Sequence, residues 1–267
     1  MKTFGFIGTG NMGGALAKAA AKVVDAENLL LSDGYAPVAE KLAGELGCKA
    51  VAVNTVAVSA DFIFLGVKPQ VMATMLCGIA PFLAARTDDF VLVSMAAGIS
   101  IADIRRMAGG DYPVIRIMPN IPVKSGSGVI LYDCSENVTE EMVEGFCHAM
   151  TYAGLVDRLP EQMIDAGSAL SGCGPAFVSL FVEALADGAV ACGLPRNKAL
   201  AYAEQTLLGT AKYLLETGEQ PGALKDAVCS PGGSTIEGVL ALEAGGFRAA
   251  AADAVVSAFE KTKELGR

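Results

Sequence analysis

The stretch FIGTGNMGG, residues 6–14, decides the fold of this 267-residue chain. It contains a G-x-G-x-x-G pattern made by Gly8, Gly10 and Gly13. An apolar, strand-like run precedes the pattern, and a helix-like segment begins near Asn11. In that context the pattern is typical of a loop that cradles a dinucleotide, whereas the glycines alone would indicate only a tight turn. We therefore predict a strand, a dinucleotide-binding loop and a helix at the start of the chain.

Each part of the loop has an expected task. Gly8 permits the tight turn, Gly10 lets the backbone approach the pyrophosphate, and Gly13 lets the helix pack closely against the strand. The N–H groups and the dipole at the start of the helix would hold the negative charge. We expect the loop to bind the cofactor through Gly8, Thr9, Gly10, Asn11, Met12 and Gly13.

Beyond this loop, short apolar runs alternate with helix-like segments through the first half of the chain. The strand-like runs are residues 3–7, 29–33, 49–53, 61–67, 90–95, 113–118 and 128–133. Strands of continuous apolar residues separated by helices predict a parallel sheet covered on both faces, as in a doubly wound, Rossmann-like α/β domain. After Pro160 only helical patterns follow, so we place one domain at residues 1–158 and an all-helical domain at residues 159–267.

Asp33 ends the second predicted strand, about twenty residues after the loop, where dinucleotide-binding folds place an acid that binds ribose. A carboxylate there can accept a hydrogen bond from the 2′-hydroxyl of NAD and would repel the 2′-phosphate of NADP. The next residues, GYAP at 34–37, include no Lys or Arg. The residue thus favours NAD(H), but a solvated aspartate in a turn is an alternative interpretation.

Further loops follow predicted strands and should lie at the same carboxyl edge of the sheet, where ligands bind. Lys68 could hold a phosphate or carboxylate, or simply be solvated before a helix that begins with proline. Pro119 and Asn120 follow a later strand and are also candidates for contact with a ligand. The remaining cofactor-binding candidates in these loops are Val67, Lys68, Pro69, Ala96, Ala97 and Gly98.

Composition excludes several classes of protein. A net charge of −9 without a basic run argues against a nucleic-acid partner. Seven scattered cysteines, never spaced as C-x-x-C, indicate reduced thiols in a cytoplasmic protein, and a single histidine disfavours metal sites. The most apolar stretch, residues 176–194, contains Glu183 and Asp187, so we interpret it as a helix buried against another subunit rather than in a membrane.

The assembled segments resemble the Δ1-pyrroline-5-carboxylate reductase family along the whole chain. The segments that carry the resemblance are FIGTGNMG, LGVKPQ, SMAAGIS, RIMPNIP, LSGCGPAFVSLFVEALADGAVACGLPR and KDAVCSPGGSTIEGVLALEAGGFRAA. The resemblance implies a Rossmann-like domain and a helical domain that forms a dimer, with further assembly into decamers. It also implies reduction of a cyclic imine, L-1-pyrroline-5-carboxylate, to L-proline with NADPH or NADH.

The loop SPGGST, residues 230–235, suits the carboxylate of such a substrate. Its glycines let backbone N–H groups approach, and its hydroxyls add donors. The resemblance implies that Thr235 binds the ring nitrogen and relays a proton, although a plain helix cap is the alternative. It also brings Glu161 near the substrate; the alternative is an exposed acid in the first helical turn after Pro160, stabilised by the dipole of that helix. The substrate-binding candidates are Ser230, Gly232, Gly233, Ser234, Thr235 and Glu161.

Two departures from the family and two rival functions bear on this interpretation. Ala227 stands where some members have Asn, and Asp33 with Gly34 stands where NADPH-preferring members often have other residues, so the cofactor is left as NAD(P)H. A β-hydroxyacid dehydrogenase would need a lysine in the first long helix of the second domain, and residues 174–188 contain none. A non-catalytic nicotinamide-binding sensor would have no use for residues 230–235.

Overall fold

The computed structural model describes residues 2–265 and divides the chain into two compact units. The first unit runs to Gly172 and includes the end of the last helix, from Phe259 onward. The second unit comprises Cys173–Ala258.

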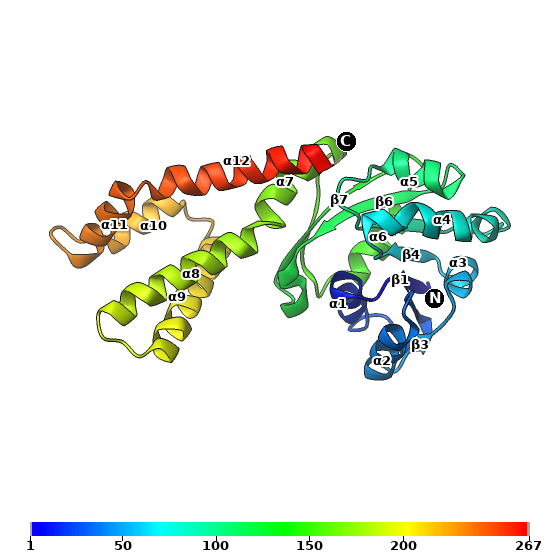
Figure 1. Cartoon of the computed structure of the whole chain (residues 1–267), viewed down its shortest axis with the longest axis horizontal. Helices are drawn as coiled ribbons and strands as arrows, with labels where there is room; N and C mark the ends of the chain where they lie inside the picture. The colour runs from blue at the N-terminus through cyan, green and yellow to red at the C-terminus, as the bar shows by residue number, and fades with distance from the viewer. Residues whose placement is uncertain (1, 266–267) are drawn as a thin grey trace. The chain divides into compact units, whose positions relative to one another are not determined.

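The first unit is an eight-stranded sheet with helices on both faces (Figure 1). The strand order is β3-β2-β1-β4-β5-β6-β7-β8. The strands are β1 (Phe4–Ile7), β2 (Leu29–Ser32), β3 (Lys49–Ala50), β4 (Phe62–Leu65), β5 (Val91–Ser94), β6 (Val114–Pro119), β7 (Gly128–Cys134) and β8 (Gly154–Arg158). The helices are α1 (Asn11–Ala20), α2 (Ala36–Leu46), α3 (Val53–Ser59), α4 (Pro69–Ala84), α5 (Ile101–Ala108), α6 (Glu140–Ala149) and α7 (Glu161–Ser171). Short 3₁₀ helices lie at Ala26–Asn28 and Ile121–Ser125.

The central strands are buried on both faces, which explains their continuous apolar sequences. On one face, the Phe6 ring of β1 stacks on the Phe64 ring of β4 with centroids 4.4 Å apart, under α1, α2 and α6. On the other face, Met72 and Leu76 of α4 pack with residues of α3 and α5. The Rossmann-like architecture predicted from the sequence is confirmed.

The sheet is not entirely parallel, because β6 and β7 are antiparallel neighbours (Figure 1). The chain connects them through residues 120–127, which contain only the 3₁₀ helix Ile121–Ser125. A parallel crossover needs about a dozen residues or more, so this connection is too short for one. The prediction of a parallel sheet was wrong at this pair. The edge strand β8, which was not among the predicted strands, is parallel to β7.

The compact units divide later than the predicted boundary between residues 158 and 159. Helix α7 remains with the sheet, because Ile164 is fully buried in a cluster with Met118 of β6 and Leu131 of β7. A hydrogen bond also connects the end of α7 to this unit, since Nδ2 of Asn120 donates to the Ser171 carbonyl at 2.9 Å. The first helix after Pro160 therefore belongs to the first unit.

The second unit is entirely helical within its described residues. Its helices are α8 (Gly174–Ala191), α9 (Arg196–Thr217), α10 (Pro221–Val228), α11 (Ser234–Ala244) and the first part of α12 (Phe247–Leu265). Helix α8 confirms the helix predicted from the apolar stretch at residues 176–194. Ala186 is its only residue that the chain buries fully, whereas Leu180 is 68% exposed. The segment Glu161–Ala191 is long and apolar enough, by length and composition alone, to cross a membrane.

Candidate functional site

The glycine loop between β1 and α1 has a geometry that only glycine allows. Gly8 has a φ of +92°, and a Cβ on it would lie 2.6 Å from the carbonyl carbon of Gly66. A Cβ on Gly13 would overlap the Gly8 carbonyl oxygen, and one on Gly66 would overlap the same atom. Three glycines thus bring α1 close to the ends of β1 and β4. The sequence pattern identified Gly8 and Gly13, but Gly66 lies outside the motif.

Gly10 differs from these packed glycines because it faces open space. A Cβ placed on it would have no atom within 4 Å, and Gly10 is the residue that precedes the first turn of α1. The first N–H groups of a helix have no partner within the helix, and they attract anions. Gly10 and Asn11 are therefore exposed beside the N–H groups that begin α1, which is an arrangement suited to a pyrophosphate. Thr9 is buried beneath it, and Met12 is half-buried.

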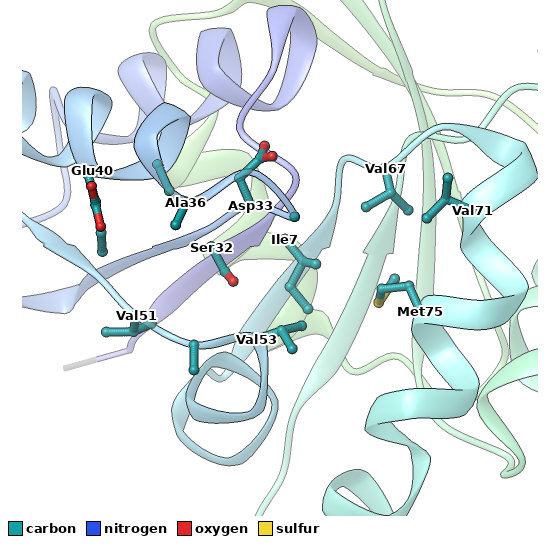
Figure 2. Close-up of a pocket in the computed structure, with 14 residues that line it drawn as sticks. Ile7, Ser32, Asp33, Ala36, Glu40, Val51, Val53, Val67, Val71 and Met75 are labelled. Atoms are coloured by element: carbon teal, nitrogen blue, oxygen red, sulfur yellow. The ribbon is translucent and has the colours of Figure 1, made fainter.

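The carboxylate of Asp33 is bonded to this loop. It accepts hydrogen bonds from the Thr9 backbone N–H at 2.7 Å, from the Thr9 hydroxyl at 3.3 Å and from the Tyr35 backbone N–H at 3.0 Å. Asp33 also lines a cavity of about 480 Å³ at the carboxyl ends of β1 and β2 (Figure 2). Asp33 is therefore held at the cavity edge and is not a freely solvated side chain in a turn.

The loops after β4 and β5 also lie at this edge of the sheet. Val67 lines the cavity, the exposed Lys68 precedes α4, and Pro69 is the first residue of that helix. After β5, Ala96 is buried, Ala97 is exposed, and Gly98 has a φ of +71°. The carboxyl-edge position expected for these residues is thus observed, whereas their contacts with a cofactor remain a prediction.

Asn120 is a buried residue whose side chain connects two parts of the first unit. Its side-chain amide is engaged on both sides, because Oδ1 accepts from the Val129 N–H at 2.9 Å while Nδ2 donates to the Ser171 carbonyl. The side chain is 7% exposed. These two bonds connect β7 and the end of α7, so the structure favours a structural task over the ligand contact considered from the sequence.

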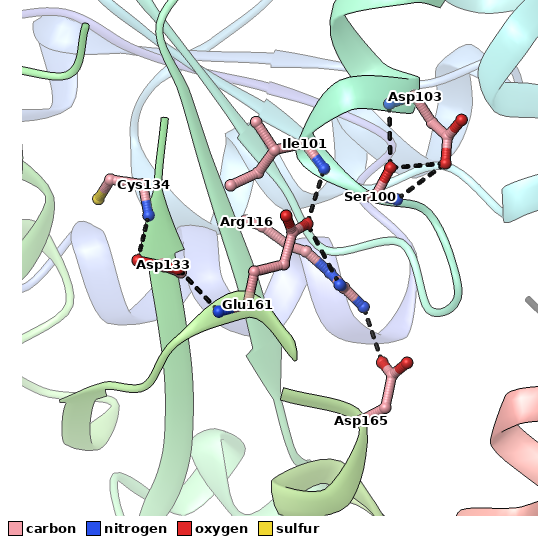
Figure 3. A network of polar contacts seen from close by, with 8 residues as sticks. All are labelled: Ser100, Ile101, Asp103, Arg116, Asp133, Cys134, Glu161 and Asp165. Carbon is pink, nitrogen blue, oxygen red and sulfur yellow. Dashed lines mark hydrogen bonds and ion pairs between the residues drawn. The ribbon is translucent and has the colours of Figure 1, made fainter. Parts of the chain in front are cut away.

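Glu161 belongs to a polar network in the first unit (Figure 3). Its Oε1 accepts from the Ile101 backbone N–H at 2.8 Å, at the start of α5, and lies 3.3 Å from Nη1 of Arg116. Asp165 accepts from Nη2 of the same arginine at 2.8 Å. The Glu161 N–H itself donates to Asp133 at 2.7 Å. Glu161 is thus half-buried and bonded to the start of α5, which differs from an exposed acid stabilised by the dipole of its own helix, and its contact with a substrate stays a prediction.

Glu161 is the one residue of this network that the sequence had pointed to, and Arg116 at its centre was not predicted. Arg116 is 5% exposed, comes from the buried strand β6, and is neutralised by two carboxylates from α7. At the start of α5, the Ser100 hydroxyl and the backbone lower the pKa of Asp103, mainly through the side-chain hydrogen bond. The bonds of Arg116 and Glu161 thus attach the starts of α7 and α5 to the sheet.

The second unit carries the other candidate loop, between α10 and α11. Gly232 has a φ of +67°, and the Gly233 N–H donates to the Ser230 carbonyl at 3.0 Å, which closes the turn. Helix α11 begins at Ser234, so Ser234 and Thr235 occupy its first turn, and both are exposed. Hydroxyls and unpaired helix N–H groups thus lie together on an accessible surface. Such a surface can bind a small carboxylate.

Two family models match the chain. The model described as pyrroline-5-carboxylate reductase dimerisation matches residues 161–265, and the model described as NADP oxidoreductase, coenzyme F420-dependent, matches residues 3–98. Proteins named pyrroline-5-carboxylate reductase from Methanosarcina acetivorans and Escherichia coli are each 39% identical to it. The first alignment covers 98% of this chain and 97% of the relative, and the second covers 100% and 99%.

Solved structures agree with these relatives. A Plasmodium falciparum pyrroline carboxylate reductase with NADP bound is 30% identical, with a TM-score of 0.86, and the match covers 100% of this chain and 98% of that one. A Coxiella burnetii pyrroline-5-carboxylate reductase is 28% identical with a TM-score of 0.92, over 100% and 99% of the two chains. The similarity extends over both compact units and includes both candidate loops.

Proposed function

The chain belongs to the pyrroline-5-carboxylate reductase family, and we propose on that basis that it reduces L-1-pyrroline-5-carboxylate to L-proline with NAD(P)H, the last step of proline synthesis. The observation that carries this proposal is the 39% identity to named reductases over essentially the whole chain. Because the identity covers both units, it includes the nucleotide loop and residues 230–235. The enzyme is therefore an oxidoreductase that acts on a carbon–nitrogen double bond.

The first unit supplies the nucleotide-binding residues. The open space before Gly10 and the N–H groups at the start of α1 accommodate the pyrophosphate. Val67, Lys68 and Pro69, together with Ala96, Ala97 and Gly98, are the further residues that we assign to cofactor contacts. When bound, the reduced nicotinamide supplies the hydride that adds to the imine carbon.

The second unit supplies the residues that hold the imino acid. Ser230, Ser234 and the N–H groups of Gly232, Gly233 and the first turn of α11 bind the carboxylate. The Thr235 hydroxyl bonds the ring nitrogen and relays a proton from water to it as the carbon accepts the hydride. The double bond becomes a single bond, the nitrogen becomes an amine, and no strong base is needed. This matches a chain that has one histidine.

We assign the exposed apolar surface of the second unit to a homodimer interface. A groove of about 420 Å³ between α8 and α12 is lined by apolar side chains, including Phe181 and Phe247, whose rings lie 5.2 Å apart. Patches of this kind mark protein interfaces. The dimerisation model that matches residues 161–265 supports the same assignment. A further assembly of five dimers into a decamer is part of the proposal.

A second copy is a better cover for α8 than a lipid bilayer. Glu183 and Asp187 lie in the middle of this apolar helix, and bilayers tolerate such charges poorly. In α7, Glu161 and Asp165 are bonded to Arg116 of the sheet, which holds that half of the segment in the first unit. Seven free cysteines further support a reducing compartment. We therefore place the enzyme in the cytoplasm.

The decisive experiment follows the absorbance of NADH and NADPH with purified protein and pyrroline-5-carboxylate. Oxidation that requires the imine, with proline as the product, supports the proposal. A protein that binds the nucleotide yet oxidises none in the presence of the imine would instead be a nicotinamide-binding sensor, and the reductase assignment would be wrong.

A further inference from the structure

We propose that the cavity beside Asp33 selects a dinucleotide with a free 2′-hydroxyl, so that this chain prefers NADH to NADPH. The inference rests on the proposed function, which leaves the choice between the two nucleotides open. The structure of one relative contains NADP, whereas the residues around Asp33 in this chain favour NADH.

The cavity is suited to the adenosine end of the nucleotide. It lies next to the glycine loop, at the carboxyl ends of β1 and β2, where this fold binds the ribose that follows the pyrophosphate. Its walls are mainly apolar, and Figure 2 shows their side chains around the open space. The apolar lining residues include Ile7, Val51, Val53, Val67, Val71 and Met75. Such walls can enclose an adenine ring on both faces.

Asp33 has the geometry of a fixed acceptor. A carboxylate has about four acceptor positions, and Asp33 uses three of them for the two donors of Thr9 and the Tyr35 N–H. One position remains, which is what a single ribose hydroxyl requires. Because the three bonds also prevent the side chain from turning away, a 2′-phosphate in the same place would face a charge that cannot withdraw.

The charges around the cavity have one sign. Asp33 and Glu40 are the charged residues among those that line it, and both are carboxylates. A 2′-phosphate carries about −1.5 to −2 charges near neutral pH and usually binds to Arg or Lys. The lining therefore repels the phosphate without offering a cation.

Two basic residues beside the glycine loop lie outside this cavity. Lys18 and Lys124 line a separate pocket beside Gly10 and Asn11. The Lys18 ammonium is bonded to Glu45 at 2.8 Å, and this bond lowers the pKa of the Glu45 carboxyl. Lys18 is thus already neutralised, and it lies outside the cavity that Asp33 lines.

Direct binding measurements test the preference independently of catalysis. Titration calorimetry of the full chain with NADH and with NADPH should give a dissociation constant for NADPH at least about tenfold higher, which corresponds to about 1.4 kcal/mol. The ratio of the NADPH dissociation constant to that of NADH should decrease as the salt concentration is raised, because screening weakens the repulsion between exposed charges.

Single substitutions test whether Asp33 and Glu40 cause the preference for NADH. Asp33→Asn should lower the ratio of the NADPH dissociation constant to the NADH dissociation constant at least about threefold, a change of roughly 0.7 kcal/mol. Glu40→Gln should lower the same ratio less. Glu141→Gln, an equal charge change on the exposed surface of α6, is the matched control and should leave the ratio unchanged. A thermal melt checks that Asp33→Asn folds, and Glu40→Gln provides the test if it does not.

The possible results distinguish a failure of the NADH preference from a failure of the reductase assignment. NADPH binding as tightly as NADH overturns the preference but leaves the reductase intact. A ratio that neither Asp33→Asn nor Glu40→Gln changes overturns the assignment to these carboxylates. Binding of neither nucleotide overturns the preference and the proposed function together.

Discussion

Replacing Gly8 with alanine should destabilise the protein at the nucleotide loop, and the loss of unfolding free energy can be worked out from the structure. At a φ of +92° an alanine is strained by about 1–3 kcal/mol. Its Cβ would also lie 2.6 Å from the Gly66 carbonyl carbon and 2.8 Å from the Val67 nitrogen. Because both are backbone atoms that cannot rotate away, the overlap should add about 1–3 kcal/mol. We expect Gly8→Ala to lose about 2–6 kcal/mol of unfolding free energy.

Two other glycines separate these contributions. Gly47 has a φ of +70°, and a Cβ on it would have no atom within 4 Å, so Gly47→Ala should lose only about 1–2 kcal/mol from backbone strain. Gly44 lies inside α2, also with open space around it, and Gly44→Ala should gain about 0.5–1 kcal/mol. The three variants thus differ in strain and overlap while each adds one methyl group.

Urea unfolding followed by circular dichroism, with thermal melts in parallel, measures the three effects. The expected order of stability is Gly44→Ala, wild type, Gly47→Ala and Gly8→Ala, with a fall in melting temperature of at least about 4 °C for the last. A Gly8→Ala variant as stable as Gly47→Ala would refute the close approach of the loop to Gly66.

Three further predictions concern the two loops and the core. Gly10→Val should fold normally but bind NADH at least about tenfold more weakly, because its side chain fills the space before α1; unchanged calorimetric affinity would contradict the pyrophosphate cradle. Thr235→Ala should lower kcat/KM about 100-fold, the lower range for loss of a proton donor, with an unchanged affinity for NADH; a wild-type rate would remove Thr235 from the mechanism. Burial raises the pKa of the Cys134 thiol to about 11, above its unfolded value, so its contribution to stability is complete below about pH 8.5 and is lost as pH rises through 11. Melting temperatures should fall over that range, and Cys134→Ala should reduce the slope; an identical slope would show that Cys134 does not contribute.

Local sequence predicted the first unit well where one strand and one helix alternate. The runs around Phe6 and Phe64 became central strands because apolar residues cover both faces of the sheet there. The antiparallel β6–β7 pair was missed because strand direction depends on the length of the connection. Residues 120–127 are too few for a crossover, so that signal was present in the sequence.

Side-chain partners distant in sequence could not be predicted. Glu161 bonds to the Ile101 N–H, and Arg116 collects carboxylates from α7, across separations of 45 residues or more. No periodicity encodes such pairs. The close packing of Gly66 against Gly8 was also not predicted, because it joins two parallel strands that are distant in sequence.

The burial of α8 is another property that its own sequence could not settle. The apolar composition of residues 176–194 predicted a buried helix, yet the single chain leaves most of α8 accessible. Composition reports how much apolar surface needs a cover, but it does not identify the cover. The proposed dimer supplies one, and its formation is open to direct measurement by sedimentation.

Transfer of deuterium from the nicotinamide to the product tests the central claim most directly. The full-length protein is incubated with pyrroline-5-carboxylate and NADH that carries deuterium at both C4 positions, and the product is analysed by mass spectrometry. Our account predicts proline that is one mass unit heavier, with the deuterium on the ring carbon that was doubly bonded to nitrogen. Proline without deuterium, or NADH consumed without proline, would contradict it.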